Sequence, residues 1–278
     1  MPIAPHEYEY IRELVRVRAG ITLESGKEYL VETRLTPLAR HEGLKGIDDL
    51  ISKMRSGPLA LSLIRKVIEA MTTNETSFFR DMHPFDALRD KVIPDLLAKR
   101  AVSKTISIWC AAASSGQEPY TTLMLLRENF PQLFTGGWRF NFVATDLSSE
   151  MIRRCKEGKF SQLEVNRGLP AALMVKYFKK NGMEWQIDEQ LRKACEFREM
   201  NLCEDWHGLG NIDIVFMRNV LIYFSVETKR QILGKVRKIM KPDGYLFLGG
   251  AETTINIDDA YDRVQIQRSG IYQVRSAA

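Results

Sequence analysis

The stretch Cys110–Pro119 (CAAASSGQEP) places small and polar residues where a ligand could approach the backbone closely. It follows the apolar run Ile106–Cys110 and precedes a helical pattern, so the first N–H groups of that helix would be free to bind. Gly116 is its only glycine, which does not fit the GxGxxG pattern of dinucleotide binding. Glu118 would repel a phosphate but could hold an ammonium or hydroxyl group. A turn of small residues used for packing is the alternative interpretation.

A carboxylate ends the next apolar run, Phe140–Asp146. At the end of a strand in a parallel sheet, Asp146 could accept both hydroxyl groups of a ribose. An Asp in this position could equally cap the helix that follows.

Polar residues also follow the run Ile212–Met217, where Arg218 and Asn219 interrupt an apolar stretch and Tyr223 adds a hydroxyl group. A tyrosine packed in the core is the alternative interpretation of Tyr223. Because the carboxyl ends of parallel strands meet at one edge of the sheet, these segments are expected to share one ligand site. A small-residue loop, a ribose carboxylate and no phosphate cradle favour S-adenosylmethionine, and therefore a methyltransferase.

Strands and helices alternate from about residue 96 onward. Tyr245–Leu248 is predicted as a further strand after a turn at Pro242–Gly244. The alternation predicts an α/β fold with a doubly wound, mostly parallel sheet covered on both faces. Near the end of the chain, Val264–Gln267 and Ile271–Val274 flank Ser269-Gly270 and predict an antiparallel hairpin.

Two other regions depart from this alternation. Residues 1–70 carry apolar residues at helical spacing, separated by glycines, and predict an all-α N-terminal domain. Residues 71–95 would join it to an S-adenosylmethionine-binding catalytic domain at 96–278. Within that domain, residues from about 156 to 200 predict an inserted antiparallel β-subdomain whose strands include Met183–Ile187 and Cys195–Arg198.

The composition excludes several classes of protein. The 278 residues are 45% hydrophobic and 27% charged, which is typical of a globular chain rather than a disordered or fibrous one. No apolar run approaches the ~20 residues of a membrane helix, and the start of the chain does not fit a signal peptide, so we expect a cytoplasmic protein without membrane insertion. Four separated cysteines with no CxxC predict no metal site. A net charge of +5 is too weak to indicate nucleic-acid binding.

The segment joining the predicted domains, MTTNETSFFRD (71–81), is polar and aromatic, and Asn74 and Arg80 could clamp a cleft. This segment resembles the CheR-type chemotaxis receptor methyltransferases. The other matching stretches are WCAAASSGQEPY (109–120), ATDLSSEMI (144–152), REMNL (198–202), VFMRNVLIYF (215–224) and KPDGYLFLGGAE (241–252). They keep their order over nearly the whole chain, including a helical N-terminal domain and an inserted β-subdomain.

The resemblance implies an enzyme that methylates glutamate side chains on the cytoplasmic helices of chemoreceptors, with S-adenosylmethionine as methyl donor and S-adenosylhomocysteine as product. The cofactor-binding residues that it implies are Asn74, Thr76, Arg80, Glu118, Asp146, Asn201, Leu202, Arg218 and Asn219. Arg80 and Tyr223 would face the acceptor carboxylate as catalytic residues. A glutamate with a pKa of about 4.3 is ionised at neutral pH, so the reaction needs no general base.

Recognition of the receptor has two candidate surfaces. The basic residues Arg34, Arg40, Lys45, Lys53 and Arg55 of the helical domain could dock on an acidic receptor helix, although solvated surface charge explains each of them equally well. Some family members bind a C-terminal receptor pentapeptide through a Gly-x-Gly loop in the β-subdomain.

The corresponding stretch here, Tyr177–Met183, has the lone Gly182, so we predict no pentapeptide tether. Two other functions stay open: a methyltransferase with a small-molecule or RNA acceptor, and a signalling module that binds the cofactor without turnover.

Overall fold

The structure is a computed structural model that describes residues 3–55, 60–266 and 269–275. Contacts between its residues divide the chain into two units, which we describe separately. The helical unit comprises residues 1–73 together with 223–228, and the sheet unit comprises residues 74–222 and 229–278.

Four helices build the helical unit, as the apolar spacing predicts. They are α1 (Pro5–Ala19), α2 (Glu28–His41), α3 (Ile47–Arg55) and α4 (Ala60–Met71). Ile11, Val15, Val31, Leu35 and Val67 are fully buried between them. These residues recur every three or four positions, so each helix turns one apolar stripe toward a common core.

Arg34 does not belong to an exposed basic face. Its guanidinium donates to the carbonyls of Met71 and Thr72 at 2.6 and 2.9 Å and to Thr73 Oγ1 at 2.7 Å. The last carbonyls of a helix have no partner within the helix, and Arg34 satisfies those at the end of α4. The other four predicted docking residues, Arg40, Lys45, Lys53 and Arg55, are exposed.

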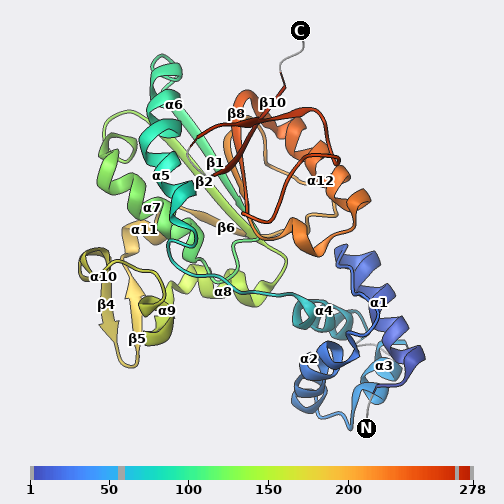
Figure 1. The fold of residues 1–278 in the computed structure, drawn as a ribbon. Helices are drawn as coiled ribbons and strands as arrows, with labels where there is room; N and C mark the ends of the chain where they lie inside the picture. Colours follow the sequence, from blue (N-terminus) through green and yellow to red (C-terminus); the bar gives the residue numbers. More distant parts are fainter. Residues whose placement is uncertain (1–2, 56–59, 267–268, 276–278) are drawn as a thin grey trace. The chain divides into compact units, whose positions relative to one another are not determined.

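A seven-stranded sheet forms the centre of the sheet unit (Figure 1). Its strands are β1 (Thr105–Ala111), β2 (Arg139–Asp146), β6 (Glu196–Glu199), β7 (Ile212–Met217), β8 (Met240–Leu248), β9 (Tyr261–Val264) and β10 (Gly270–Val274). The order is β6-β2-β1-β7-β8-β10-β9, with parallel pairs as far as β8 and antiparallel pairs at β8–β10 and β10–β9. Every residue of β7 is buried, which requires cover on both faces.

Helices pack on both sides of this sheet. They are α5 (Met82–Ala87), η1 (Leu88–Val92), α6 (Ile93–Lys99), α7 (Gln117–Asn129), α8 (Ser149–Glu157) and α12 (Val226–Ile239). Two short helices, η2 (Pro131–Leu133) and η3 (Leu221–Tyr223), lie in connecting segments, and Tyr223 of η3 already belongs to the helical unit. Figure 1 shows α5, α6 and α7 on one side of β1 and β2, and α12 beside β8 and β10. The predicted α/β class with a terminal antiparallel hairpin is confirmed. None of the described helices is both long and apolar enough to span a membrane.

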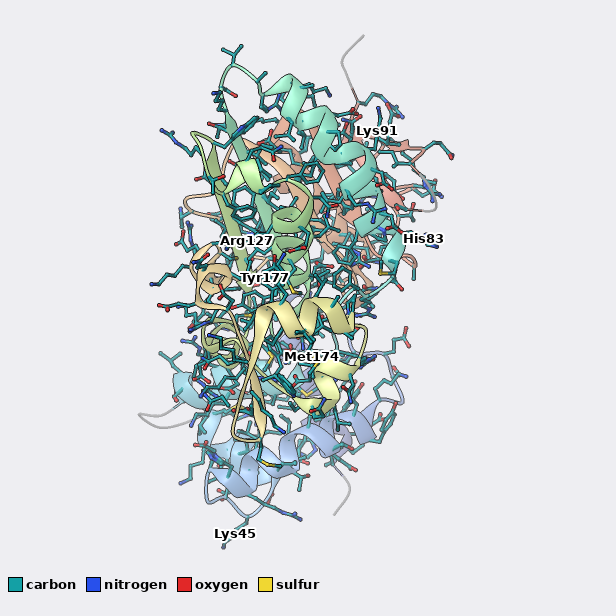
Figure 2. All side chains as sticks on the ribbon, turned by 90° about the vertical axis from the view of Figure 1, so that its left-hand side faces the viewer. Lys45, His83, Lys91, Arg127, Met174 and Tyr177 are labelled. Atoms are coloured by element: carbon teal, nitrogen blue, oxygen red, sulfur yellow. The ribbon has the colours of Figure 1, made fainter. Side chains whose placement is uncertain are left out.

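A small antiparallel sheet is inserted between α8 and β6, as predicted. Its elements are β3 (Lys159–Ser161), α9 (Gln162–Asn166), α10 (Ala171–Tyr177), β4 (Phe178–Asn181), β5 (Glu184–Ile187) and α11 (Glu189–Lys193), with strand order β3-β5-β4. Tyr177 donates a hydrogen bond to Glu128 of α7, and Lys176 pairs with the same carboxylate at 2.6 Å. Figure 2 shows Tyr177 and Arg127 in this region, where α10 meets α7.

The predicted strand Cys195–Arg198 does not belong to this small sheet. Residues 196–199 form β6, which pairs in parallel with β2 and is the edge of the large sheet. An edge strand exposes alternate residues to solvent, so its sequence resembles that of a half-exposed antiparallel strand.

Two strand boundaries also differ from the prediction. Pro242–Gly244 lies within β8 rather than in a turn before it, opposite a register shift near Ile212. A Cβ on Gly244 would lie 3.0 Å from the Asp213 carbonyl oxygen, so this close pairing requires glycine. The first strand of the final hairpin is β9 (Tyr261–Val264), which ends where the predicted strand Val264–Gln267 begins, and residue 267 of that predicted strand lies outside the described residues.

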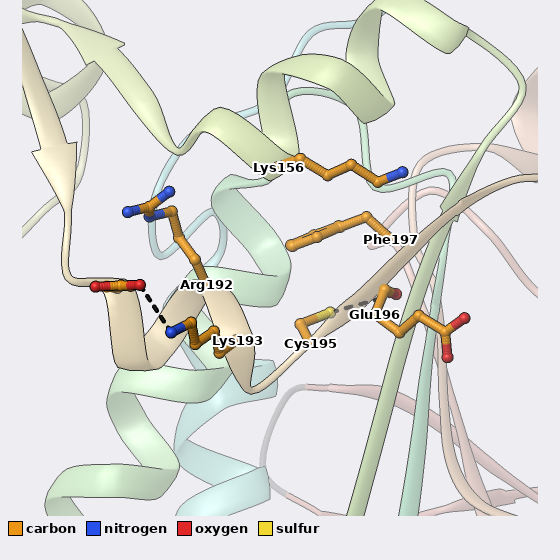
Figure 3. Close-up of a pocket in the computed structure, with 7 residues that line it drawn as sticks. Lys156, Arg192, Lys193, Cys195, Glu196 and Phe197 are labelled. Carbon is orange, nitrogen blue, oxygen red and sulfur yellow. Dashed lines mark hydrogen bonds and ion pairs between the residues drawn. The ribbon is translucent and has the colours of Figure 1, made fainter.

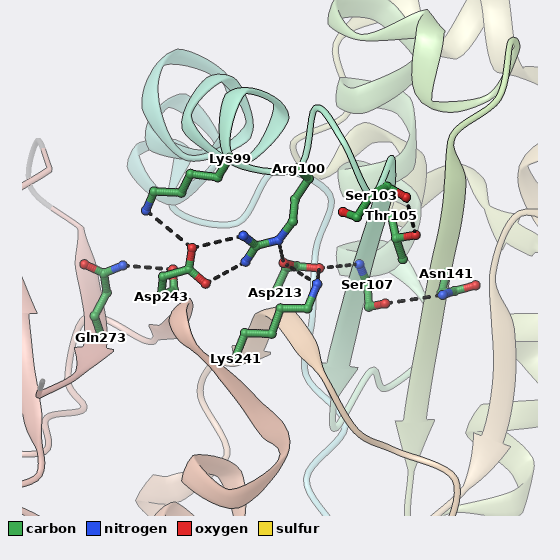
Figure 4. A network of polar contacts seen from close by, with 10 residues as sticks. All are labelled: Lys99, Arg100, Ser103, Thr105, Ser107, Asn141, Asp213, Lys241, Asp243 and Gln273. Atoms are coloured by element: carbon green, nitrogen blue, oxygen red, sulfur yellow. Dashed lines mark hydrogen bonds and ion pairs between the residues drawn. The ribbon is translucent and has the colours of Figure 1, made fainter.

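An ionic cluster joins α6 to the amino ends of β7, β8 and β1 (Figure 4). Asp213 has no exposed surface and accepts from Arg100 at 2.9 Å, from Lys241 at 2.9 Å and from the Ser107 N–H at 2.8 Å. Asp243 completes the cluster with two hydrogen bonds from Arg100, which lower the pKa of the Asp243 carboxyl group. One fully buried carboxylate therefore holds three strands and a helix together.

Replacement of Asp213 by Ala is expected to destabilise the fold by about 3–5 kcal/mol, because it removes the buried carboxylate that pairs with Lys241 and leaves Arg100 with Asp243 alone. Denaturant unfolding measures this loss. Asp262→Asn is the matched control, since it breaks an exposed ion pair with Arg275 and is expected to leave the unfolding midpoint unchanged. Equal stability of Asp213→Ala and parent would contradict the anchoring role.

Candidate functional site

The predicted site residues of the sheet unit gather at the carboxyl ends of its strands. The order of strands in the sheet reverses at β1. From β1 the chain continues to β2 and β6 on one side of β1, and then to β7 and β8 on the other side. Ligands of open α/β sheets bind at such a reversal. The loops after β1, β2, β6 and β7 therefore define the candidate site.

Backbone strain is concentrated in these loops and in the segment before α5. Among the described residues other than glycine, most of those with a left-handed backbone lie here: Phe79 (φ +49°), Asp81 (φ +56°), Ala112 (φ +55°), Ser114 (φ +50°) and Asn219 (φ +59°). Such a conformation costs about 1–3 kcal/mol per residue and persists only where the surroundings impose it. Clustered strain of this kind is typical of binding and catalytic sites.

Asp146 ends β2 and is 6% exposed. One carboxylate oxygen accepts the N–H of Ser114 at 2.8 Å and the other accepts the N–H of Ser148 at 2.9 Å. Two backbone amides thus set the orientation of the carboxylate and fasten the loop after β1 to the end of β2. Each carboxylate oxygen can accept more than one hydrogen bond, so this geometry suits a vicinal diol as well as it suits a cap.

The segment 74–81 is fastened to the same loop. Ser114 Oγ donates to the carbonyl of Asn74 at 2.7 Å, and the N–H of Phe79 donates to Thr121 Oγ1 at 3.1 Å. Thr76 is half-buried in this segment. The structure therefore brings Asn74 to the loop that Asp146 holds, and the place of Thr76 in the site stays a prediction.

Arg218, directly after β7, connects several of the predicted residues. Its side chain is 1% exposed and donates to Glu118, to the Arg80 carbonyl at 2.8 Å and to Asp81 Oδ2 at 3.1 Å. The guanidinium also lies 5.5 Å from the ring centre of Phe85. Its Nε is buried without a hydrogen-bond partner in the structure. A buried cation needs compensating charge, and Glu118 and Asp81 supply it.

The Arg80 side chain itself stays partly exposed, and its guanidinium donates to the Glu75 carbonyl at 3.0 Å. Glu118 accepts a further contact from the Cys110 thiol at 3.3 Å. Burial raises the pKa of Cys110, and the charge of Glu118 raises it further, so the thiol stays protonated and can donate. The thiol is therefore a structural neighbour of Glu118 and not a nucleophile.

The loop after β6 carries Asn201 and Leu202. Asn201 Oδ1 accepts the N–H of Cys203 at 3.0 Å, and Leu202 is 7% exposed. Sequence reasoning missed Lys235 of α12, whose ammonium donates to the carbonyls of Leu202 and Glu204 at 2.6 and 2.7 Å. No local pattern pointed to Lys235, because its position on a helix resembles that of any solvated lysine.

Tyr223 is described apart from these residues. By its contacts it belongs to the helical unit, where its carbonyl accepts the N–H of Thr22 at 2.9 Å. Its catalytic role stays a prediction.

A cleft of about 410 Å³ lies elsewhere in the sheet unit. It is lined by Lys156, Glu189, Arg192, Lys193, Cys195, Glu196 and Phe197. Figure 3 shows the ammonium of Lys156 and the guanidinium of Arg192 on opposite sides, and Lys193 pairs with Glu189 at 2.8 Å. The cations do not converge on one point, and none of the predicted site residues lines this cleft. Across the described part of the chain, no group of three or more His, Cys, Asp or Glu residues could hold a metal ion.

The donors at the carboxyl edge fit an adenosyl group. A backbone-oriented carboxylate at the end of β2 suits a ribose, and the first turn of α7 has acidic Glu118 where a phosphate would need a donor. Together with a sheet that ends in an antiparallel hairpin, these features define the class of S-adenosylmethionine-dependent methyltransferases.

Comparison with known proteins specifies the family. The family described as CheR methyltransferase, all-alpha domain, matches residues 6–72, and CheR methyltransferase, SAM binding domain, matches residues 74–269. The chemotaxis protein methyltransferase Cher2 of Pseudomonas putida is 39% identical over 274 residues, which cover 97% of this chain and 98% of that protein. Chemotaxis protein methyltransferase 1 of Pseudomonas aeruginosa is 40% identical over 280 residues, which cover 99% and 100%. The chain belongs to the CheR methyltransferase family and is an S-adenosylmethionine-dependent methyltransferase of chemotaxis.

Replacement of Asp146 by Ala is expected to weaken S-adenosylhomocysteine binding by about 1.5–3 kcal/mol for each hydrogen bond lost to the ribose. Titration calorimetry measures the affinity, and circular dichroism checks the fold. Asp188→Ala is the matched control, because Asp188 also follows a strand and caps a helix by accepting the N–H of Gln190 at 2.8 Å. Unchanged affinity in Asp146→Ala would assign this carboxylate to capping alone.

Proposed function

We propose that this enzyme transfers the methyl group of S-adenosylmethionine to glutamate side chains on the cytoplasmic helices of chemoreceptors, and thus acts in the cytoplasm. The observation that carries the proposal is the match to both CheR domains along nearly the whole chain. In this proposal residues 1–70 form the receptor-docking domain, 71–95 the interdomain segment and 96–278 the catalytic domain, with the β-subdomain inserted at about 156–200.

The proposed cofactor site uses the residues at the carboxyl edge of the sheet. Asp146 would accept the ribose hydroxyl groups, and Asn201 and Leu202 would flank the adenine. Glu118, with Asn74, Thr76 and Arg80, would contact the polar remainder of the cofactor, and Arg218 and Asn219 would close the pocket. The ion pair of Arg218 with Glu118 keeps this cluster close to neutral, which suits a cofactor that carries a sulfonium charge.

The proposed chemistry requires little from the protein. Bound S-adenosylmethionine supplies a methyl group that is attached to a sulfonium. When the methyl group is transferred, the sulfur departs as a neutral thioether. The acceptor glutamate is already ionised at neutral pH, so its carboxylate attacks without a general base. Positioning of the reacting groups is then the main source of the rate acceleration. Well-oriented groups can lower the activation barrier by about 7–11 kcal/mol. Arg80, whose side chain is half-exposed, would orient the carboxylate, but too strong a pairing would stabilise the ground state.

The test is transfer of a labelled methyl group to a purified receptor cytoplasmic fragment, followed by mild base. Release of the label as methanol identifies a methyl ester. A fragment with glutamine in place of its acidic methylation residues is the control. Base-stable label on the receptor, or label only on a small molecule or RNA, would support another acceptor. Cofactor binding without any transfer would support a signalling module.

Receptor docking is proposed for the exposed basic residues Arg40, Lys45, Lys53 and Arg55 of the helical unit. Lys45 projects from the end of this unit (Figure 2), and Arg55 lies 4.4 Å from the ring centre of Tyr10. Arg34 is left out because it is bonded to the end of α4. A basic face of this kind would attract an acidic receptor helix, and its contribution would fall as salt increases.

For Tyr223, we expect Tyr223→Phe to lower kcat while S-adenosylhomocysteine affinity stays unchanged, because only a hydrogen bond to the acceptor carboxylate is lost. Steady-state methylation and calorimetry together measure the two effects. Tyr120→Phe serves as the comparison, because its buried hydroxyl group donates to the Cys155 carbonyl at 2.5 Å, so this variant loses a hydrogen bond within the fold and none to the acceptor. Equal turnover by Tyr223→Phe and parent would return Tyr223 to a packing role.

We also propose that the enzyme uses no C-terminal receptor pentapeptide. The strands β4 and β5 pair from Asn181 and Glu184 outward, which leaves only Gly182 and Met183 in the turn. Gly182 has a φ of +63°, the backbone that tight hairpins need at this position. A two-residue turn has no room for a longer glycine loop, which supports the proposal.

Calorimetry against C-terminal receptor pentapeptides is accordingly expected to give no binding at micromolar concentration. Methylation of receptors with and without that tail should proceed at the same rate. Micromolar binding, together with loss of methylation on truncation, would show that the tether is used.

A further inference from the structure

Glu252 is a buried carboxylate at the candidate site that the cofactor assignment does not use. It follows the end of β8 and is 8% exposed. One carboxylate oxygen accepts the N–H groups of Asn219 and Gly249, each at 2.7 Å, and the other accepts the N–H of Ile222 at 3.3 Å. Its partners are therefore backbone amides from the turns after two neighbouring strands, β7 and β8.

These contacts fix an unfavourable backbone. Asn219 has a φ of +59°, and its N–H is one of the two shorter bonds to Glu252. Left-handed residues revert to extended or helical backbone unless something holds them. Hydrogen bonds to a charged acceptor are about twice as strong as neutral ones, and a buried carboxylate requires such donors. Glu252 and the turn at Asn219 thus stabilise each other.

Gly249 shows how closely the two turns approach. A Cβ on Gly249 would lie 2.7 Å from Asn219 Nδ2, 2.8 Å from Glu252 Oε2 and 2.9 Å from the Asn219 nitrogen. The neighbouring Gly250 would place a Cβ in open space. Glycine at 249 is therefore required for the contact between Glu252 and Asn219, whereas glycine at 250 is not.

We propose that Glu252 is a positioning residue, which sets the backbone of residues 218–222 so that Arg218 and Asn219 can close the cofactor pocket. It acts through Asn219 and Ile222 and does not touch the cofactor itself. The direction of the Arg218 side chain toward Glu118 and Asp81 depends on the same turn, because Arg218 directly precedes Asn219. This inference rests on the proposed cofactor site.

The first test is Glu252→Gln in the full chain, with S-adenosylhomocysteine affinity measured by calorimetry and the unfolding midpoint measured separately. A glutamine nitrogen cannot accept, so at least one of the three N–H groups loses its partner. The dissociation constant is expected to rise about ten- to hundredfold. Glu164→Gln is the control, because Glu164 also accepts a backbone N–H, that of Ser161 at 2.8 Å, but lies in the β-subdomain. Its affinity is expected to equal that of the parent.

The second test compares Gly249→Ala with Gly250→Ala. Gly249→Ala is expected to weaken S-adenosylhomocysteine binding in the same direction as Glu252→Gln, and Gly250→Ala is expected to leave it unchanged. Parent-like affinity in both Glu252→Gln and Gly249→Ala would overturn the positioning role. This holds also if the unfolding midpoint of these variants falls while their affinity stays unchanged. If Asp146→Ala binds S-adenosylhomocysteine as tightly as the parent does, the cofactor assignment itself is overturned. The failure of the positioning role and the failure of the cofactor assignment are therefore distinguishable.

Discussion

The buried guanidinium of Arg218 is the interaction on which the candidate site depends. With its side chain 1% exposed, it exchanges hydration for Glu118, Asp81 and the Arg80 carbonyl. These partners lie 100 to 138 residues away in the sequence. Because an unpaired buried charge is very costly, folding must bring together the segment before α5, the first turn of α7 and the end of β7.

The two ends of the sheet use buried charge for different purposes. At the amino end, Asp213 is saturated by Arg100, Lys241 and a backbone amide, and these partners join three strands to a helix. At the carboxyl end, Asp146 and Glu252 accept backbone amides from turns that contain left-handed residues. The first arrangement stabilises the fold, whereas the second holds loops in conformations that they would not adopt alone. A rigid scaffold whose carboxyl edge carries loops held in fixed conformations is what a site based on positioning requires.

The methyltransferase assignment and the acceptor assignment rest on different grounds. The strand order, the terminal hairpin and the two matching family domains define the enzyme class and its methyl donor. In the function proposed here, the choice of acceptor depends on surfaces beyond the cofactor pocket, namely the exposed basic residues of the helical unit and the β-subdomain. A two-residue turn between β4 and β5 makes that subdomain a compact hairpin. Recognition by the helical unit therefore becomes the simpler hypothesis.

The sequence by itself determined the elements whose signals are local. Apolar runs predicted β1, β2 and β7, helical spacing predicted the four helices of the helical unit, and the motif at 109–120 marked the loop after β1. Such signals survive because burial on both faces, or on one helical stripe, imposes the pattern residue by residue.

Only the tertiary structure decided which polar groups pair. The strand at 196–199 joins the large sheet, Arg34 closes the end of α4, and Glu252 holds the turn at Asn219. In each case the partner is distant in sequence or is a backbone group. Neither kind of partner produces a periodic pattern in the sequence. An edge strand, a surface arginine and a loop glutamate look alike in many proteins, because their role is set by what the fold places beside them.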